Sequence, residues 1–304
     1  FFMKISIIDM PLFYGCDNPG VDKGPKILRE NNLLNIFNKS HQVCDMGEVH
    51  VKNVSSKDKY AANDKMKYLD EVLDANYALA QKVYESHENS YLPLVIGGDH
   101  SLGLGSVAGT SKYYKNDIAV IWVDAHGDIN TDETSPSGNI HGMPLSASMG
   151  FGHARLTSFF DEKQKVKPNN VFIIGCRDLD LGEINLINEH NLNVWTMEDV
   201  KIKGMSKVLD ELMIKLHKNK VKNIHFSFDI DSLDPSLVPG TGTPVENGLS
   251  FEEGRQAIER IISTNLVRSM DLVEFNPQLD NTTTTLETCL KLSNVISDAF
   301  SLVK

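Results

Sequence analysis

The sequence predicts a three-layer α/β/α fold built around a mostly parallel sheet of about eight strands. Short apolar segments rich in β-branched residues alternate with longer segments that carry apolar residues at helical spacing. Several short segments are apolar throughout, which is typical of parallel strands covered by helices on both faces. The alternation continues along all 304 residues without an internal repeat, a low-complexity tract or a Pro/Gly-rich linker. We therefore expect residues 1–304 to form a single domain.

The predicted elements follow one another in βα order, which implies right-handed connections and parallel strands. The eight predicted strands are residues 4–9, 42–45, 92–97, 118–124, 171–175, 193–196, 223–229 and 267–274. The seven predicted helices are residues 24–38, 61–87, 102–112, 181–190, 205–218, 251–263 and 282–303. The polar stretch at 53–64 predicts a surface loop that enters a helix.

Composition and charge restrict the class of protein. Hydrophobic residues make up 41% and charged residues 23%, an ordinary globular balance. The formal net charge of −11 disfavours non-specific binding to nucleic acid and is compatible with a cationic ligand. Four scattered cysteines without a CxxC pair argue against a disulfide framework and favour a reducing cytoplasm. No apolar run approaches membrane-spanning length, so we expect no membrane partner.

Ionisable residues follow four of the predicted strands at the point where each strand ends. His100 follows the strand at 92–97, and Glu274 ends the strand at 267–274. The other two strands run into the segments DAHGD, residues 124–128, and DID, residues 229–231. Because ligands of open α/β folds bind beyond the carboxyl ends of the strands, we expect these side chains to lie together at one edge of the sheet.

This gathering of carboxylates and imidazoles predicts a metal site. A single Asp after a strand is usually a turn or capping residue, and a lone His is usually a core residue. Four neighbouring aspartates, however, would raise one another's pKa and destabilise the fold unless cations lie between them. Two divalent ions would balance their charge, and mixed carboxylate and imidazole ligands suit Mn²⁺, with zinc left open. The six candidate metal ligands are His100, Asp124, His126, Asp128, Asp229 and Asp231.

The spacing of the ligands requires a bend after the fourth strand. Fully extended, Asp124 and Asp128 would lie about 13 Å apart at roughly 3.3 Å per residue. Paired catalytic metals lie only about 3.5–4 Å apart, so the chain must curl, and we expect Gly127 to permit the bend. Because paired metals lower the pKa of bound water towards neutrality, the sequence predicts a hydrolase.

Four motifs together resemble the ureohydrolase family. They are GGDHS (97–101), DAHGDIN (124–130), SGNIHGMP (137–144) and SFDIDSLDPSLVPGTGTPV (227–245). The resemblance covers essentially the whole chain and implies an arginase-like fold with two Mn²⁺ per chain. It assigns His100, Asp124, Asp128 and Asp231 to one ion. It assigns Asp124, His126, Asp229 and Asp231 to the other, so that Asp124 and Asp231 bridge.

Within that family the sequence is most similar to arginases. The loop DINTDETSPSGNIHG, residues 128–142, resembles the arginase loop that binds the substrate α-carboxylate. The segment RDLDLGE, residues 177–183, resembles the segment near the substrate α-amino group. The resemblance implies hydrolysis of L-arginine to L-ornithine and urea, through attack of a metal-bridging hydroxide on the guanidinium carbon. The implied substrate-binding residues are Asn130, Ser135, Ser137, Asn139, Asp180, Glu183, Thr243 and Glu274.

The resemblance also implies catalytic roles for three residues. Asp128 would accept a proton from the attacking hydroxide, and His141 would relay protons to the leaving amine. Glu274 would face the guanidinium, since a carboxylate is the natural partner of that planar cation. A structural hydrogen bond is the alternative role for His141. The family also implies a homo-oligomer, a trimer or hexamer.

Two other functions remain open at this point. Another ureohydrolase, such as an agmatinase or a formiminoglutamase, shares the metal ligands but not the carboxylate-binding loop. A non-catalytic metal-binding protein of the same fold is a second alternative. The presence of all six ligands together with His141 and Glu274 argues against a decayed site.

Overall fold

The structure, a computed structural model, describes residues 3–161 and 164–303 and contains one eight-stranded sheet. The strand order is β2-β1-β3-β8-β7-β4-β5-β6, and every pairing is parallel. The prediction of a mostly parallel sheet of about eight strands is thus confirmed. The strands are β1 (Lys4–Met10), β2 (Gln42–Glu48), β3 (Leu92–Gly97), β4 (Ala119–Val123), β5 (Val171–Cys176), β6 (Asn193–Thr196), β7 (Ile224–Asp229) and β8 (Val267–Val273).

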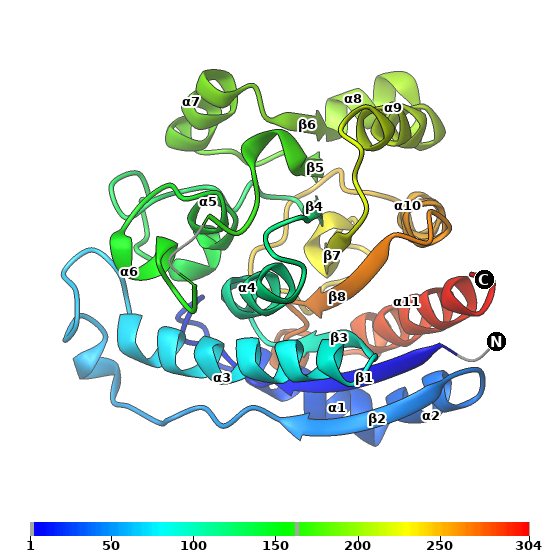
Figure 1. The fold of residues 1–304 in the computed structure, drawn as a ribbon. Coiled ribbons are helices and arrows are strands. Elements are labelled where there is room, and N and C mark those ends of the chain that lie inside the picture. Colours follow the sequence, from blue (N-terminus) through cyan, green and yellow to red (C-terminus); the bar gives the residue numbers. More distant parts are fainter. Residues whose placement is uncertain (1–2, 162–163, 304) are drawn as a thin grey trace.

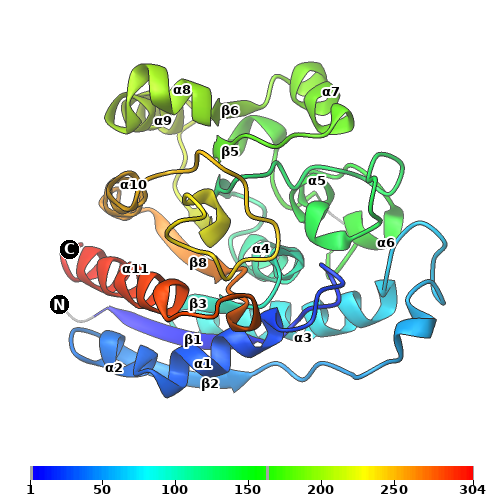
Figure 2. The ribbon, with the colours of Figure 1, turned by 180° about the vertical axis from the view of Figure 1, so that it is seen from behind.

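Helices cover both faces of the sheet, which confirms the three-layer prediction (Figure 1). One face packs against α1 (Gly24–Glu30), α2 (Leu33–Asn38), α8 (Met197–Lys203), α9 (Met205–Lys218), α10 (Phe251–Ile262) and α11 (Thr284–Ser301). The opposite layer comprises α3 (Leu69–Glu88), α4 (Gly103–Tyr113), α5 (Pro144–Ser148), α6 (Ala154–Thr157) and α7 (Leu181–His190). Figure 2 shows the first layer from its own side, with α1, α2 and α11 in front of the strands.

Alternation along the strands explains the two layers of the core. In β4, Ile121 and Val123 belong to the apolar cluster that includes α9 and α10. The intervening Val120 and Trp122 belong to the cluster that includes α4 and α5. Successive side chains of a strand point to opposite faces, so an apolar strand serves both layers.

Some helix boundaries differ from the predicted ones. The predicted helix at 24–38 is two helices, because Asn32 adopts a left-handed φ of 71° between α1 and α2. The predicted helix at 61–87 begins only at Leu69, after Tyr68 with a φ of 52°. The short helices α5, α6 and α8 were not predicted, since a few residues give little periodicity to detect. Within the described residues, none of the helices combines the length and apolarity that a membrane span requires.

Candidate metal centre and active site

Four adjacent strands, β3, β8, β7 and β4, deliver the predicted ionisable residues to one edge of the sheet. His100 lies in a 3-10 turn after β3, Asp124 follows β4, Asp229 ends β7, and Glu274 follows β8. All four side chains are buried, with at most 2% of each residue exposed. The prediction that these strand ends converge is therefore confirmed.

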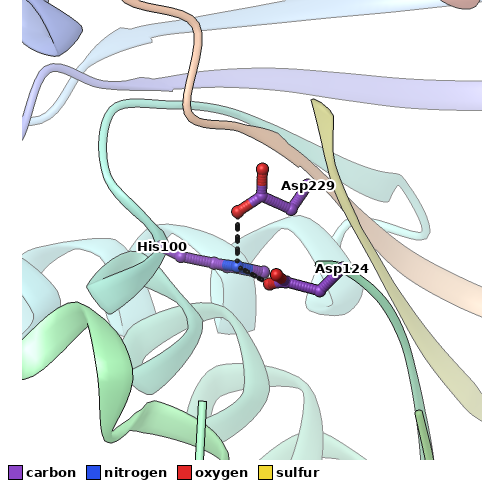
Figure 3. Close-up of side chains that lie close together, drawn as sticks. All are labelled: His100, Asp124 and Asp229. Atoms are coloured by element: carbon purple, nitrogen blue, oxygen red, sulfur yellow. Dashed lines mark hydrogen bonds and ion pairs between the residues drawn. The ribbon is translucent and has the colours of Figure 1, made fainter. Parts of the chain in front are cut away.

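His100 is the centre of the first group of candidate ligands. Its Nδ1 atom lies 2.9 Å from Asp124 Oδ2, 3.0 Å from Asp128 Oδ2 and 3.1 Å from Asp229 Oδ2. Figure 3 shows the Asp124 and Asp229 carboxylates directed at this nitrogen from different strands. One imidazole nitrogen surrounded by three carboxylate oxygens is a donor set that fits a divalent cation.

His126 is the centre of the second group. Its Nδ1 atom lies 3.3 Å from Asp124 Oδ1 and 3.2 Å from Asp231 Oδ2. Asp124 thus presents one oxygen to each histidine and is the residue common to both groups, as predicted. The resemblance assigned Asp231 to both groups, but of the Asp229–Asp231 pair only Asp229 is among the described ion-pair contacts of His100 Nδ1. It is Asp229 that approaches His100, because Asp229 ends the strand whereas Asp231 lies in the following 3-10 turn.

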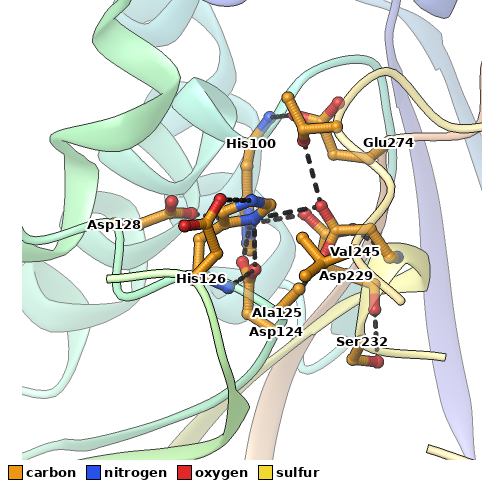
Figure 4. A network of polar contacts seen from close by, with 12 residues as sticks. His100, Asp124, Ala125, His126, Asp128, Asp229, Ser232, Val245 and Glu274 are labelled. Atoms are coloured by element: carbon orange, nitrogen blue, oxygen red, sulfur yellow. Dashed lines mark hydrogen bonds and ion pairs between the residues drawn. The ribbon is translucent and has the colours of Figure 1, made fainter. Parts of the chain in front are cut away.

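The carboxylates and imidazoles of the two groups form one network of polar contacts (Figure 4). Despite its burial, Asp124 has a pKa lowered by His100 and His126, whereas the other aspartates of the groups have raised pKa values. Burial and the Asp124 charge raise the pKa of Asp128 to about 7. Burial, Asp231 and Asp124 raise the pKa of Asp229 well above its usual range. Burial and Asp124 likewise raise the pKa of Asp231. Divalent cations at the two groups would remove this repulsion, so the residues present fit a two-metal centre.

The chain bends between Asp124 and Asp128, but Gly127 does not supply the unusual backbone conformation. Asp128 itself adopts the left-handed φ of 52°. Gly127 is required for a different reason, because a Cβ there would lie 2.9 Å from Glu183 Oε1 and 3.0 Å from Leu179 Cδ2. The predicted bend is confirmed, whereas the predicted role of Gly127 is corrected from flexibility to close packing.

A cavity of about 200 Å³ opens beside the metal groups. Its described wall includes five acidic side chains besides Asp128, and it contains no Lys or Arg. A larger hollow of about 870 Å³ between α9, α10 and α11 contains neither of the two ligand groups found among the described residues. The predicted site residues in the wall of the small cavity are His126, Asp128, Asn130, Ser135, Ser137, Asn139, His141, Asp180, Glu183, Asp229, Asp231 and Thr243.

Hydrogen bonds connect the predicted carboxylate loop to the start of α7. Asn130 Nδ2 donates to Asp180 Oδ2 at 2.7 Å. Glu183 accepts from the backbone N–H of Asp180 at 2.9 Å and from that of Ile129 at 3.2 Å. Burial raises the pKa of Glu183 to about 7. Glu183 therefore caps α7 and fixes the chain next to Asp128, in addition to lining the cavity.

Glu274 is buried next to His141 of the cavity wall and is not itself among the residues that line the described cavity. It adopts a left-handed φ of 73°, and its Oε1 accepts from the His100 N–H at 2.7 Å. The same oxygen lies 3.1 Å from His141 Nδ1. Burial disfavours the charged form of His141, but the hydrogen bond to Glu274 and the negative charges of Glu274, Asp128 and Asp99 together raise the pKa of His141 to about 9. This pKa favours the protonated form of His141 at neutral pH.

A family model described as "Arginase family" matches residues 3–296 of the sequence. The chain belongs to the arginase family. It is 43% identical to an arginase of Bacillus subtilis (strain 168) over 289 residues, which cover 95% of each chain. A crystal structure of arginase from the same species has a TM-score of 0.89 at 41% identity, with 97% of this chain and 98% of the other covered.

A more distant arginase shares the fold as well. Entamoeba histolytica arginase, solved in complex with L-ornithine, has a TM-score of 0.88 at 33% identity and covers 97% of this chain and 98% of its own. The predicted ureohydrolase resemblance is confirmed, and this chain is an arginase-family hydrolase.

Two residues of the arginase-family site were not predicted. The indole of Trp122 stacks on the His100 ring, with centroids 3.9 Å apart and planes 7° apart, and Nε1 donates to Asp124 Oδ2 at 3.1 Å. Ser227 Oγ lies 2.8 Å from His100 Nε2. A sequence signal existed for both, since each lies two positions before a ligand on the same strand face.

Proposed function

We propose that this arginase-family protein hydrolyses L-arginine to L-ornithine and urea with two Mn²⁺ bound per chain. The observation that carries the proposal is the pair of histidine–carboxylate groups that share Asp124 beside an acidic cavity. When bound, a pair of divalent ions supplies an activated water near neutral pH. Carboxylate and imidazole donors support Mn²⁺ as the ion.

The chain's own residues would hold the ions in two sets. His100 Nδ1, Asp128 and Asp229 would hold the first ion, since their donor atoms converge. His126 Nδ1 and Asp231 would hold the second ion. The two oxygens of Asp124 would serve one ion each. Thr243 Oγ1 donates to Asp231 Oδ2 at 3.2 Å and would orient that ligand.

The acidic wall supports a guanidinium as the reacting group. Asp128 would accept the proton of the attacking water, since its carboxylate lies in the cavity wall beside the two ligand groups. His141 would donate a proton to the leaving amine. Glu274 would accept from the guanidinium through Oε2, since its Oε1 already accepts from His100 N–H.

The loop at 130–142 supports an α-carboxylate at the other end of the substrate. Ser135 Oγ accepts the Gly138 N–H at 3.0 Å, and Ser137 Oγ accepts the Asn139 N–H at 3.1 Å. Each hydroxyl therefore keeps its own hydrogen for donation to a carboxylate. Asn130 and Asn139 would add amide donors, and Asp180 and Glu183 would accept from the α-amino group.

Urea release from manganese-loaded protein with L-arginine or agmatine tests this proposal. We expect turnover of arginine and a kcat/KM for agmatine lower by at least about 100-fold, because agmatine lacks the carboxylate that the loop would bind. Ser137→Ala should raise KM for arginine but not for agmatine, and Ser206→Ala, an exposed serine on α9 outside the cavity wall, is the control. Equal turnover of both substrates would contradict the carboxylate assignment. Absence of urea would support a non-catalytic protein.

We further propose that residues 1–304 act as one catalytic domain of a cytoplasmic homo-oligomer, a trimer or hexamer. One sheet carries all the candidate ligands, which supports a single domain. The four cysteines are free thiols, which supports a reducing compartment. Sedimentation equilibrium and cell fractionation test these points, and a monomer or a secreted protein would contradict them.

A further inference from the structure

A buried polar network lies between β7, β8 and α4, behind the metal centre. The parallel register places His225 beside Ser269 and Ser227 beside Asp271. Each of these side chains is at most 1% exposed. Ser106 of α4 completes the network from the helix layer. Burying polar groups without hydrogen-bond partners destabilises the folded state. The hydrogen bonds within the network therefore indicate what it does.

Asp271 is the centre of this network. Its Oδ2 accepts from Ser227 Oγ at 3.0 Å and from Ser106 Oγ at 2.9 Å, and it lies 2.8 Å from His225 Nε2. Its Oδ1 has no hydrogen-bond partner within the described part of the chain. One oxygen with three donors is therefore fixed in place and strongly orients the Ser227 hydroxyl.

The network reaches the metal centre through Ser227. Since the Ser227 hydroxyl donates to Asp271, its oxygen is left to accept a hydrogen bond from His100 Nε2 at 2.8 Å. When Nδ1 binds an ion, the one remaining ring proton of His100 lies on Nε2 and donates to Ser227 Oγ. Nδ1 is the atom that faces Asp124 and Asp229. A histidine that binds a metal through Nδ1 requires this tautomer.

We propose that Asp271, held by His225, is a positioning residue that acts through Ser227 to fix the tautomer and orientation of His100 for metal binding. The inference rests on the proposed role of His100 as a metal ligand. It predicts that Asp271 contributes to metal affinity although it contacts neither ion nor substrate. The same network also explains why β7 carries His225 and Ser227 on one face while Phe226 packs into the apolar core on the other.

Titration of metal-free protein with Mn²⁺, followed by the electron paramagnetic resonance signal of the free ion, tests the proposal. Asp271→Asn should weaken binding at the His100 group by about 10- to 100-fold and leave the His126 group unchanged. Asp9→Asn is a matched control, since Asp9 is 3% exposed, lies on β1 outside the site and also has an unpartnered Oδ1. The control should lower the melting temperature but bind Mn²⁺ as the wild type does.

Two further measurements separate positioning from general stability. The losses of Mn²⁺ affinity in Ser227→Ala and Asp271→Asn should not add in the double variant, because both changes break the same chain of hydrogen bonds from Asp271 through Ser227 to His100. ¹⁵N NMR of labelled histidine in protein loaded with diamagnetic Zn²⁺ should show the His100 proton on Nε2, and this signal should weaken in Asp271→Asn. His225→Asn provides a second variant if Asp271→Asn does not fold, and it should weaken the same ion.

The outcomes distinguish this inference from the proposed function. A variant Asp271→Asn that melts earlier but binds both ions normally would show a purely structural role and overturn the inference. Additive losses in the double variant would overturn it as well. Wild-type protein that binds no Mn²⁺ would overturn the metal assignment itself, and the inference with it.

Discussion

Asn130 Nδ2 donates a hydrogen bond to Asp180 Oδ2 at 2.7 Å, and this contact joins the two segments that would surround the amino-acid end of a substrate. Removing the carboxylate with Asp180→Ala should raise KM for arginine about 10-fold or more and change kcat less, since the contact acts in the ground state as well as in the transition state. Steady-state kinetics of urea release check this. Asp132→Ala, in the same loop but not in the cavity wall, is the control. Unchanged KM and kcat for Asp180→Ala would refute the proposed contact between Asp180 and the substrate α-amino group.

His100 belongs to one ligand group only, so its loss should affect one ion. His100→Asn should reduce the metal content from two Mn²⁺ to one per chain after dialysis, whereas His126→Asn should remove the other ion. Metal analysis of dialysed protein measures both, with His153→Asn as a control outside the site. Retention of two ions by His100→Asn would show that the groups are assigned wrongly.

Gly127 is packed against Glu183, and this contact limits what the position tolerates. The Cβ of Gly127→Ala would lie 2.9 Å from Glu183 Oε1, so the carboxylate must move away from the Ile129 N–H that it accepts. We expect a loss of about 1–3 kcal/mol in the free energy of unfolding and a lower kcat/KM for arginine. Gly142→Ala is the control for stability, since a Cβ there meets no atom within 4 Å. Equal stability of both variants in urea would contradict the steric argument.

His87 should make the fold sensitive to acid. It is 4% exposed, and burial, with His225 and Arg268 nearby, lowers its pKa from 6.5 to about 3. Between these values the unfolded chain binds the proton and the folded chain does not. The free energy of unfolding is therefore unaffected by His87 above pH 6.5 and decreases as the pH falls from 6.5 towards 3. It should decrease by about 2 kcal/mol between pH 7 and 5.

Urea unfolding at the two pH values measures this linkage. His87→Phe keeps a ring that can stack on Tyr113 but cannot be protonated, so the variant should lose less stability than the wild type on acidification. His217→Phe, at an exposed position, should follow the wild type. A parallel loss in wild type and His87→Phe would show that His87 does not carry the effect.

The candidate ligands were predictable because strand ends leave a strong local signal. An apolar run that stops at a carboxylate, repeated in several strands, identifies the edge of a parallel sheet and the residues that meet there. The helix break at Asn32 and the late start of α3 were not predicted, because the left-handed conformations at 32 and 68 depend on how the next helix packs against the sheet.

The sequence by itself determined the fold class, the family and the identity of the six candidate ligands, since all three depend on residue types at fixed spacing along the chain. Only the tertiary structure decided that Asp229, rather than Asp231, approaches His100, and that Asp271 reaches His100 through Ser227. These relationships join β3, β7 and β8, whose residues lie far apart in sequence. Contacts of 2.8–3.1 Å between them result from strand register and side-chain direction, which are set by the packing of the whole sheet.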